Sequence, residues 1–190
     1  MFDPESNIRT TTNDGQVLTF YEVARMGLGP RLLGLFDGGR IEEFIDGNTI
    51  SPKDLTDPEM LQALGRKLAK FHSLDLPIDR TAFNFASKAD HCIVPFNGAK
   101  DALKTQHAGG PLGDLLDKAS AFDAHKEALF CNAILKQIPM VKVFTHCDLN
   151  AQNIMLKSGK GSLFDRMLLL DIEYGNYNFA AVDLAQVFSK

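Results

Sequence analysis

The sequence changes its pattern beyond Pro139, and this change restricts the fold more than any other feature. Three short, mostly apolar runs follow one another there: VKVFT at 141–145, NIML at 153–156 and MLLLD at 167–171. Apolar runs of this length are typical of strands rather than helices. Polar residues fill the gap between the first two runs. The Gly-x-Gly sequence at 159–161 lies between the last two runs, where we expect a hairpin turn.

The first part of the chain mixes helical and strand patterns. Apolar positions predict a short helix at 17–26, a hairpin with arms at 32–36 and 40–45, and a longer helix at 57–72. The hairpin turn is expected at 37–39, because its Asp-Gly pair readily adopts the positive φ angles of tight turns.

Helix boundaries and breaks complete the outline. Asp57 is expected to cap its helix and Pro58 to occupy the first turn. Residues 78–110 show no steady period and are expected to connect elements, whereas 112–137 return to a helical period. Another helix is expected from Asn178 to the end of the chain. Helices and hairpins in separate blocks predict an α+β architecture.

Composition argues against several classes of function. The net charge of the 190 residues is −4, which gives no general affinity for nucleic acid, and no apolar run reaches the roughly 18 residues needed to span a bilayer. The first residues lack the basic and apolar segments of a secretion signal. The widely spaced Cys92, Cys131 and Cys147 argue against a disulfide framework or a zinc site, so we expect a cytoplasmic protein.

The loop after 141–145 combines groups that suit phosphoryl transfer. Asp148 and Asn153 lie five residues apart, and Asp171 ends the third apolar run. One carboxylate could accept or orient the proton of a substrate hydroxyl. An amide oxygen and a second carboxylate could hold Mg²⁺ against nucleotide phosphates, because Mg²⁺ requires oxygen ligands.

A simpler interpretation competes for each of these residues. Taken singly, Asp and Asn are most often turn or capping groups. His146 suits a structural role in the loop, and Cys147 lacks the basic partner that would make it nucleophilic. The joint pattern is more specific, because H-x-D-x-x-x-x-N followed by an apolar strand that ends in Asp is typical of kinases.

The chain resembles the choline/ethanolamine kinase family, which has a protein-kinase-like fold. The resemblance rests on the catalytic-loop pattern from His146 to Asn153, on LLLDIEYGNYNFAAVDLAQVF at 168–188, on GLGPRLLGLFDGGRIEEFI at 27–45 and on LAKFHSLDLPI at 68–78. It implies that residues 1–46 are the end of an N-lobe with its hinge, and that residues 47–190 are the core of a mainly helical C-lobe.

The same resemblance implies ATP- and Mg²⁺-dependent phosphorylation of choline, ethanolamine or both, which is a step in phospholipid head-group synthesis. The implied roles are catalytic base for Asp148, Mg²⁺ and nucleotide binding for Asp171, metal support for Asn153, nucleotide contact for Asn150, and an adenine-binding hinge for Glu43, Phe44 and Ile45. Asp183 would tie the catalytic loop to the helix that follows. Tyr174 and Tyr177 either line the alcohol pocket or pack in the core.

The chain also departs from the family. No glycine-rich loop or strand lysine precedes Gly27, and Gln16 stands near the position of the family's acidic partner. The chain has no Trp, although the family uses aromatic side chains, Trp among them, to hold a quaternary ammonium. We therefore expect a fragment of a longer kinase. An aminoglycoside phosphotransferase-like enzyme and a non-catalytic remnant that acts through binding remain alternatives. The oligomeric state stays open, with a homodimer of the kinase among the alternatives.

Overall fold

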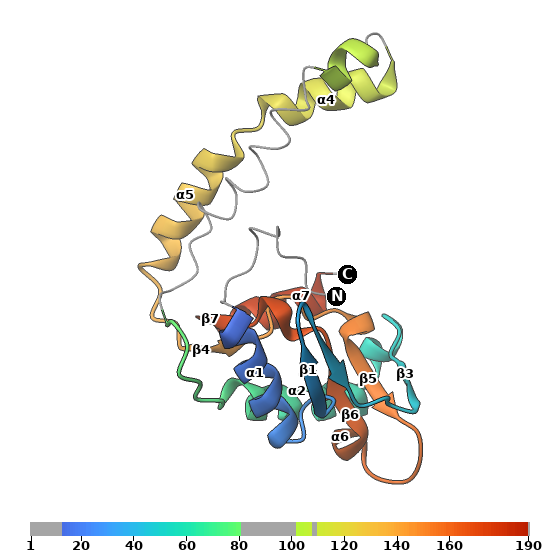
Figure 1. Ribbon diagram of the computed structural model, residues 1–190. Coiled ribbons are helices and arrows are strands. Elements are labelled where there is room, and N and C mark those ends of the chain that lie inside the picture. The colour runs from blue at the N-terminus through green and yellow to red at the C-terminus, as the bar shows by residue number, and fades with distance from the viewer. Residues whose placement is uncertain (1–12, 81–101, 108–109, 190) are drawn as a thin grey trace. The chain divides into compact units, whose positions relative to one another are not determined.

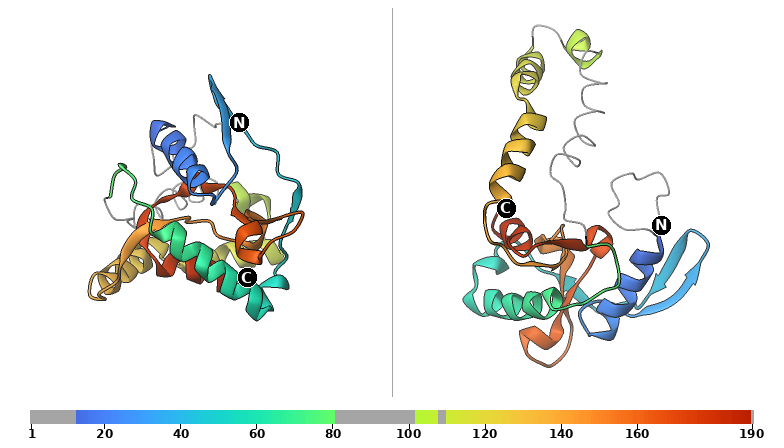
Figure 2. Two further views of the ribbon diagram at one scale, coloured as in Figure 1. Left: turned by 90° about the horizontal axis from the view of Figure 1, so that it is seen from below. Right: turned by 90° about the vertical axis from the view of Figure 1, so that its left-hand side faces the viewer.

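The computed structural model describes residues 13–80, 102–107 and 110–189 (Figures 1 and 2). The chain divides into two compact units, Met1–Phe83 with Val141–Lys190, and Asn84–Met140. We call these the main unit and the helical unit. The lobe boundary predicted between residues 46 and 47 stays a prediction.

The main unit contains helices and antiparallel strands, which confirms the predicted α+β class. Its helices are α1 (Asn13–Arg25), α2 (Pro58–His72), α6 (Leu163–Arg166) and α7 (Ala181–Phe188). Its strands are β1 (Leu32–Phe36), β2 (Gly39–Glu42), β3 (Gly47–Thr49), β4 (Lys142–Thr145), β5 (Ile154–Lys157), β6 (Met167–Leu169) and β7 (Asn176–Phe179). Short 3₁₀ turns are η1 (Asp54–Thr56), η2 (Ala151–Asn153) and η3 (Ile172–Tyr174).

The predicted early helix and hairpin are confirmed. Helix α1 begins before the predicted range and ends at Arg25, two residues before Gly27, which has a φ of +67°. Strands β1 and β2 pair across a turn at Gly38, where φ is +76°. Strand β2 ends at Glu42, earlier than predicted, and the chain continues through the exposed Phe44 toward β3. Helix α1 contacts β1, beside which it lies in Figures 1 and 2.

Helix α2 begins as the sequence predicts. The side chain of Asp57 accepts a hydrogen bond from the backbone N–H of Glu59 at 3.0 Å, and Pro58 is the first helical residue. Such a cap stabilises a helix by about 1 kcal/mol, because it satisfies an N–H that has no partner within the helix. The buried residues of α2 recur every three or four positions: Met60, Ala63, Leu64, Lys67, Leu68 and Phe71.

Antiparallel strands frame the polar loop on both sides. The strand order is β3-β5-β6 in one sheet, while β4 pairs with β7 in another. The sequence did not predict β3 or β7. Asn178 was expected to begin a helix, but it pairs with Val143 in the β4–β7 ladder, and α7 begins only at Ala181. The backbone hydrogen bonds of the ladder therefore set the start of the last helix.

The connection between β5 and β6 is longer than the predicted hairpin turn. The two strands pair as expected, with Ile154 opposite Leu169. Between them, however, lies the single-turn helix α6. The side chain of Ser162 caps this helix by accepting a hydrogen bond from the N–H of Asp165. A capping serine three residues before an aspartate is a local helix signal, and it explains the difference.

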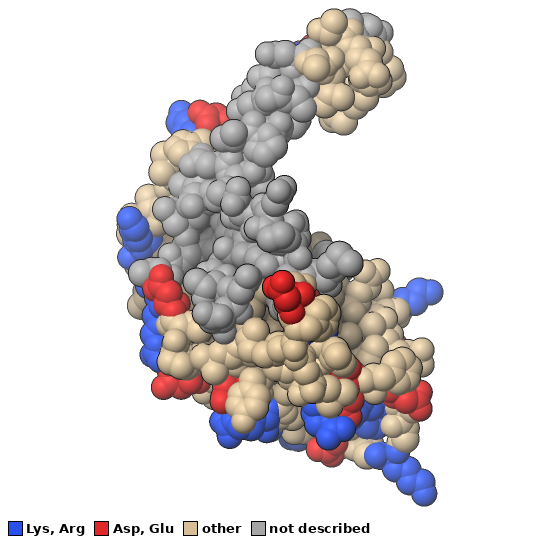
Figure 3. All heavy atoms as spheres, in the orientation of Figure 1, with Lys and Arg blue, Asp and Glu red and all other residues tan. Residues whose placement is uncertain are grey.

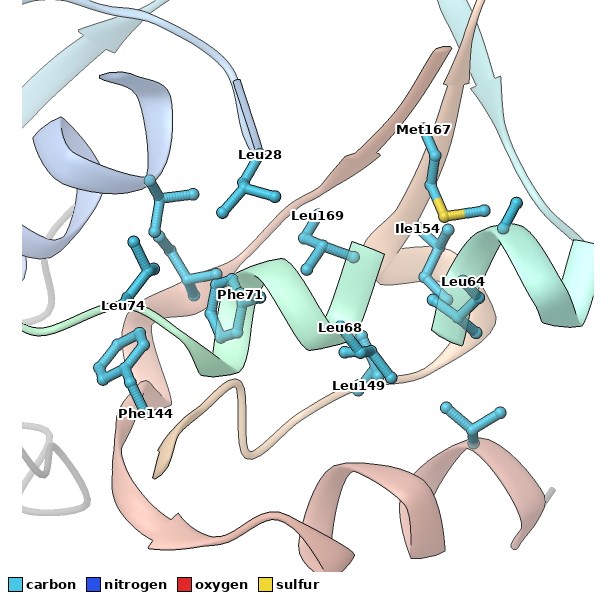
Figure 4. Close-up of a cluster of buried hydrophobic side chains, with 14 of the residues drawn as sticks. Leu28, Leu64, Leu68, Phe71, Leu74, Phe144, Leu149, Ile154, Met167 and Leu169 are labelled. Carbon is cyan, nitrogen blue, oxygen red and sulfur yellow. The ribbon is translucent and has the colours of Figure 1, made fainter. Parts of the chain in front are cut away.

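The core of the main unit lies between α2 and the strands that hold the loop. Figure 4 shows Leu64, Leu68 and Phe71 of α2 in one cluster of buried side chains that also includes Leu149 and Ile154. All five side chains are at most 3% exposed. Burial of one such side chain contributes about 1.5–3 kcal/mol. Because Leu149 belongs to the polar loop itself, this packing anchors the loop in the core.

The helical unit contains α4 (Pro111–Ala121) and α5 (Ala124–Leu135). The sequence predicted one helical stretch at 112–137, and the structure breaks it at Phe122 and Asp123. The side chain of Asp123 caps α5 by accepting from the N–H of Lys126 at 2.9 Å, so a second helix starts there. Most of the predicted irregular region at 78–110 lies outside the described residues.

Two surface properties follow from the described residues. None of their helices is long and apolar enough to cross a membrane. On the face shown in Figure 3, Lys and Arg side chains are interspersed with Asp and Glu rather than gathered in one area.

Candidate active site

The β4–β7 pair supports the beginning of the polar loop. Strand β4 ends at Thr145, whose buried hydroxyl donates to the backbone carbonyl of Asn176 in β7 at 2.8 Å. Gly175 precedes β7, and a Cβ atom there would lie 2.7 Å from the ring of Phe144. The close approach requires glycine at this position. The loop therefore leaves β4 from a fixed point.

His146 is a structural residue of the loop, as the sequence analysis expected. It is fully buried, its Nε2 bonds to the carbonyl of Leu170 at 2.7 Å, and its Nδ1 accepts from the N–H of Asp148 at 3.3 Å. A carbonyl can only accept, so Nε2 carries the proton and Nδ1 does not. Burial lowers the pKa of His146, although the Asp183 carboxylate acts in the opposite direction. The neutral ring therefore joins the loop to the residue before Asp171.

Two asparagine amides hold Asp148. Asn153 donates from Nδ2 to the Asp148 carboxylate at 3.0 Å and to its backbone carbonyl at 2.8 Å. Asn150 makes longer contacts with the same two groups, at 3.4 and 3.3 Å. Its own Oδ1 accepts from the N–H of Gln152, so its amide caps η2. The arrangement orients the carboxylate of Asp148 through local hydrogen bonds.

Asp171 lies beside this group in an uncommon backbone conformation. The N–H of Leu170 donates to the carbonyl of Asn153 at 2.8 Å, which places Asp171 next to the end of the loop. Asp171 has φ +57° and ψ +52°, the left-handed conformation that costs most L-residues roughly 1–2 kcal/mol. Its side chain is exposed. The structure thus brings together Asp148, Asn150, Asn153 and Asp171, four of the predicted site residues.

Side chains of helix α7 form hydrogen bonds with the backbone of the loop. Asp183 is fully buried, and its carboxylate accepts from the N–H groups of His146 and Cys147, both at 2.9 Å. The expected tie between Asp183 and the loop is therefore confirmed. The same carboxylate receives a hydrogen bond from His72 of α2 at 2.8 Å. Gln186 also bonds the loop backbone, through Cys147 and Leu149.

The contacts of His72 and Gln186 were not predicted from the sequence. Gln186 follows Asp183 by three residues, so the two side chains share one helix face, and this spacing is a usable signal. His72 is separated from Asp183 by 111 positions. No local pattern in the sequence predicts their contact.

The first predicted hinge residue, Glu43, makes its contacts at the base of the β1–β2 hairpin. The side chain of Glu43 forms an ion pair with Arg31 at 3.0 Å, and its N–H donates to the carbonyl of Arg31. Both the carboxylate and the backbone N–H of Glu43 are therefore bonded to Arg31. After the hinge, Gly47 pairs with Lys157, four residues beyond Asn153, which is roughly 13 Å at the rise of a strand. Phe44 is 90% exposed and Ile45 is partly buried.

Three further side chains near the loop are wholly or partly buried. Tyr177 is buried, and its hydroxyl accepts from the N–H of Leu76 at 2.7 Å, which supports the packing alternative for this residue. Tyr174 is partly buried, and burial raises the pKa of its phenol. Burial also raises the pKa of the Cys147 thiol, so it stays protonated at neutral pH. This agrees with the inert role expected for Cys147.

The donor set around Asp171 fits a magnesium ion held jointly with phosphates. Both Nδ2 hydrogens of Asn153 point to Asp148, which leaves its amide oxygen as the atom able to bind a metal. Among the described residues, no cluster of three or more His, Cys, Asp and Glu side chains is arranged for a metal. Mg²⁺ needs no such cluster, because it is commonly bound by one or two carboxylates together with substrate phosphates.

Comparison with known proteins identifies the family. The family model described as choline/ethanolamine kinase matches residues 5–190. The chain belongs to the choline/ethanolamine kinase family. It is 33% identical over 180 residues to "Probable choline kinase 3" of Arabidopsis thaliana, a match that covers 92% of the chain and 46% of that relative. This kinase family member therefore spans about half the length of such relatives.

Solved structures show the same fold. The chain resembles a Plasmodium vivax ethanolamine kinase with a TM-score of 0.71 and 20% identity, over 97% of the chain and 52% of that protein. It also resembles a Streptomyces rimosus aminoglycoside phosphotransferase solved with ADP and streptomycin, with a TM-score of 0.51 and 18% identity, over 95% of the chain and 69% of that protein. The protein-kinase-like fold is confirmed.

Proposed function

We propose that this chain contains the catalytic-loop half of an enzyme that transfers the γ-phosphoryl group of ATP to the hydroxyl of choline or ethanolamine. The observation that carries the proposal is the geometry around Asp148. Its carboxylate is oriented by Asn150 and Asn153, and the loop is joined through Leu170 to Asp171. Membership of the choline/ethanolamine kinase family supports the choice of substrate.

In the proposed reaction, Asp148 orients the substrate alcohol and accepts its proton. The alcohol oxygen attacks the γ-phosphorus of ATP, the bond to the bridging oxygen breaks, and ADP leaves. The proton of the hydroxyl passes to the Asp148 carboxylate. The amide groups of Asn153 and Asn150 fix this carboxylate before substrate arrives, which favours catalysis because the enzyme need not reorganise during the reaction.

Asp171 and the amide oxygen of Asn153 are the groups proposed to hold Mg²⁺. When bound, the ion would neutralise charge on the nucleotide phosphates. The hinge of Glu43, Phe44 and Ile45 is proposed to meet adenine. Because the N–H of Glu43 is bonded to Arg31, the proposed contact must use its carbonyl or the groups of Phe44 and Ile45.

Two alternative functions make different predictions for a substrate panel. ADP release should be measured from the purified chain with ATP, Mg²⁺ and either choline, ethanolamine or streptomycin. We expect release with choline or ethanolamine and none above background with streptomycin. Release with streptomycin alone would contradict the proposal and favour an aminoglycoside phosphotransferase. A folded chain that binds ATP without any turnover would instead favour a role through binding.

Cytoplasmic location is part of the same proposal. Cys131 and Cys147 are free thiols in the structure, as is usual in a reducing compartment. An amino alcohol is the proposed small-molecule partner.

A further inference from the structure

Helix α7 contacts the candidate catalytic loop a second time, on both sides of Asp148. Gln186 donates from Nε2 to the carbonyl of Cys147 at 2.7 Å. Its Oε1 accepts from the N–H of Leu149 at 2.9 Å. One side-chain amide therefore bonds the peptide group before Asp148 and the peptide group after it.

We propose that Gln186 is a positioning residue that fixes the backbone on either side of Asp148 and thereby the direction of the Asp148 carboxylate. The effect on catalysis rests on the proposed function. The effect on the loop does not, because it concerns only hydrogen bonds within this chain.

The two contacts require an amide. An amide carries a donor and an acceptor in one plane, whereas an ionised carboxylate can only accept. A carboxylate at this position could still accept from the N–H of Leu149, but its second oxygen would face the carbonyl oxygen of Cys147. Gln186→Glu therefore keeps the size of the side chain and breaks one of its two hydrogen bonds.

The backbone of Cys147 explains why the loop needs this support. Cys147 has a φ of +64°, in the left-handed region that non-glycine residues rarely adopt. Asp183 accepts from its N–H, and Gln186 donates to its carbonyl. Such strained conformations persist where the surroundings hold them in place. Both peptide groups of Cys147 are held by α7, so loss of Gln186 should release the conformation that precedes Asp148.

Amide hydrogen exchange tests the loop without any assay of activity. In Gln186→Ala we expect the Leu149 N–H to exchange about tenfold faster than in the unchanged chain, relative to the amides of β4, because its acceptor is lost. Gln186→Glu keeps an acceptor for this N–H and should accelerate its exchange less. Val187→Ala is the matched control. Val187 is a buried neighbour on α7, 5% exposed, so its truncation weakens the docking of the helix and keeps the amide. The proposal would be overturned if the Leu149 N–H, measured relative to the amides of β4, exchanged at the same rate in Gln186→Ala and in Val187→Ala.

Kinetics separate positioning from general destabilisation. With choline or ethanolamine we expect kcat of Gln186→Glu to fall by about tenfold or more, because small misplacements of a catalytic group are costly, while KM for ATP changes by less than about twofold. An unchanged kcat, with Leu149 exchange accelerated, would refute the catalytic part. Absence of turnover in the unchanged chain would count against the proposed function alone, since the exchange experiment still decides whether Gln186 holds the loop.

Discussion

Two residues of the candidate site have a strained backbone. Within the described residues, Cys147 and Asp171 are the non-glycine positions with positive φ. Cys147 precedes the proposed base Asp148, and Asp171 is the proposed metal ligand. Strain of this kind tends to lie where function fixes the direction of a side chain. The two residues are joined through His146, whose ring bonds the carbonyl of Leu170.

The buried side chain of Gln16 gives a prediction about the stability of the chain. It lies on α1, is 2% exposed, and neither atom of its amide finds a hydrogen-bond partner among the described residues. A buried amide without partners destabilises a protein by about 1–3 kcal/mol. Gln16→Met should therefore raise the free energy of unfolding by about 1 kcal/mol, measured by urea denaturation.

Gln16→Glu and an exposed position provide the controls for this experiment. The Glu variant should be less stable than the unchanged chain, because it buries a charge in place of the amide. Gln137→Met, at an exposed site of the helical unit, should leave stability within about 0.5 kcal/mol. A destabilised Gln16→Met would show that the amide has partners in solution.

At the scale of elements, α2 connects the core to the site. Its apolar face packs against the strands, and His72 in its last turn reaches the buried carboxylate of Asp183. The helix also buries a charge. Lys67 is 2% exposed, and its Nζ lies 4.3 Å from the centre of the Phe164 ring in α6.

Lys67 predicts how stability depends on pH. Burial lowers the pKa of Lys67 from 10.5 to about 8, and repulsion from the positive charges of Lys70 and Lys157 adds to this effect. Between pH 8 and 10.5 the unfolded chain binds this proton and the folded chain does not, so stability should rise with pH in that window, by roughly 3 kcal/mol at 1.4 kcal/mol per unit. Urea denaturation at several pH values from 7 to 10.5 measures the rise.

Lys67→Met isolates this effect from other groups that titrate in the same window. The variant should be more stable than the unchanged chain at pH 7, and the difference should shrink toward pH 10.5. A difference that is constant across the window would show that Lys67 keeps its ordinary pKa in the folded chain.

The elements show how far sequence reasoning reaches. Asp57, Gly38 and the apolar spacing of α2 act locally, so the helix and the hairpin were predictable. Strand β7 was not, because its residues, including Asn178, become a strand only by pairing with β4. The same limit applies to the site. The pattern from His146 to Asn153 identified the loop, whereas the contact of His72 with Asp183 depends on the tertiary fold.

At the scale of the whole molecule, the chain corresponds to about half of the choline/ethanolamine kinases that it matches. The catalytic loop, the residue Asp171 and helix α7 all lie in the main unit, where hydrogen bonds connect them directly. We therefore assign the proposed phosphoryl transfer to the main unit and to Asp148 in particular.

The most direct test is the transfer of labelled phosphate from γ-labelled ATP to choline or ethanolamine by the unchanged chain and by Asp148→Asn. The asparagine keeps an oxygen that can accept from Asn153 but cannot take up the proton of the alcohol. Asp114→Asn, at an exposed aspartate of α4, is the matched control for loss of a carboxylate. We expect transfer by the unchanged chain and by the control, and a loss of at least about 100-fold in Asp148→Asn with its melting temperature nearly unchanged. Equal transfer by Asp148→Asn and the unchanged chain would contradict the account.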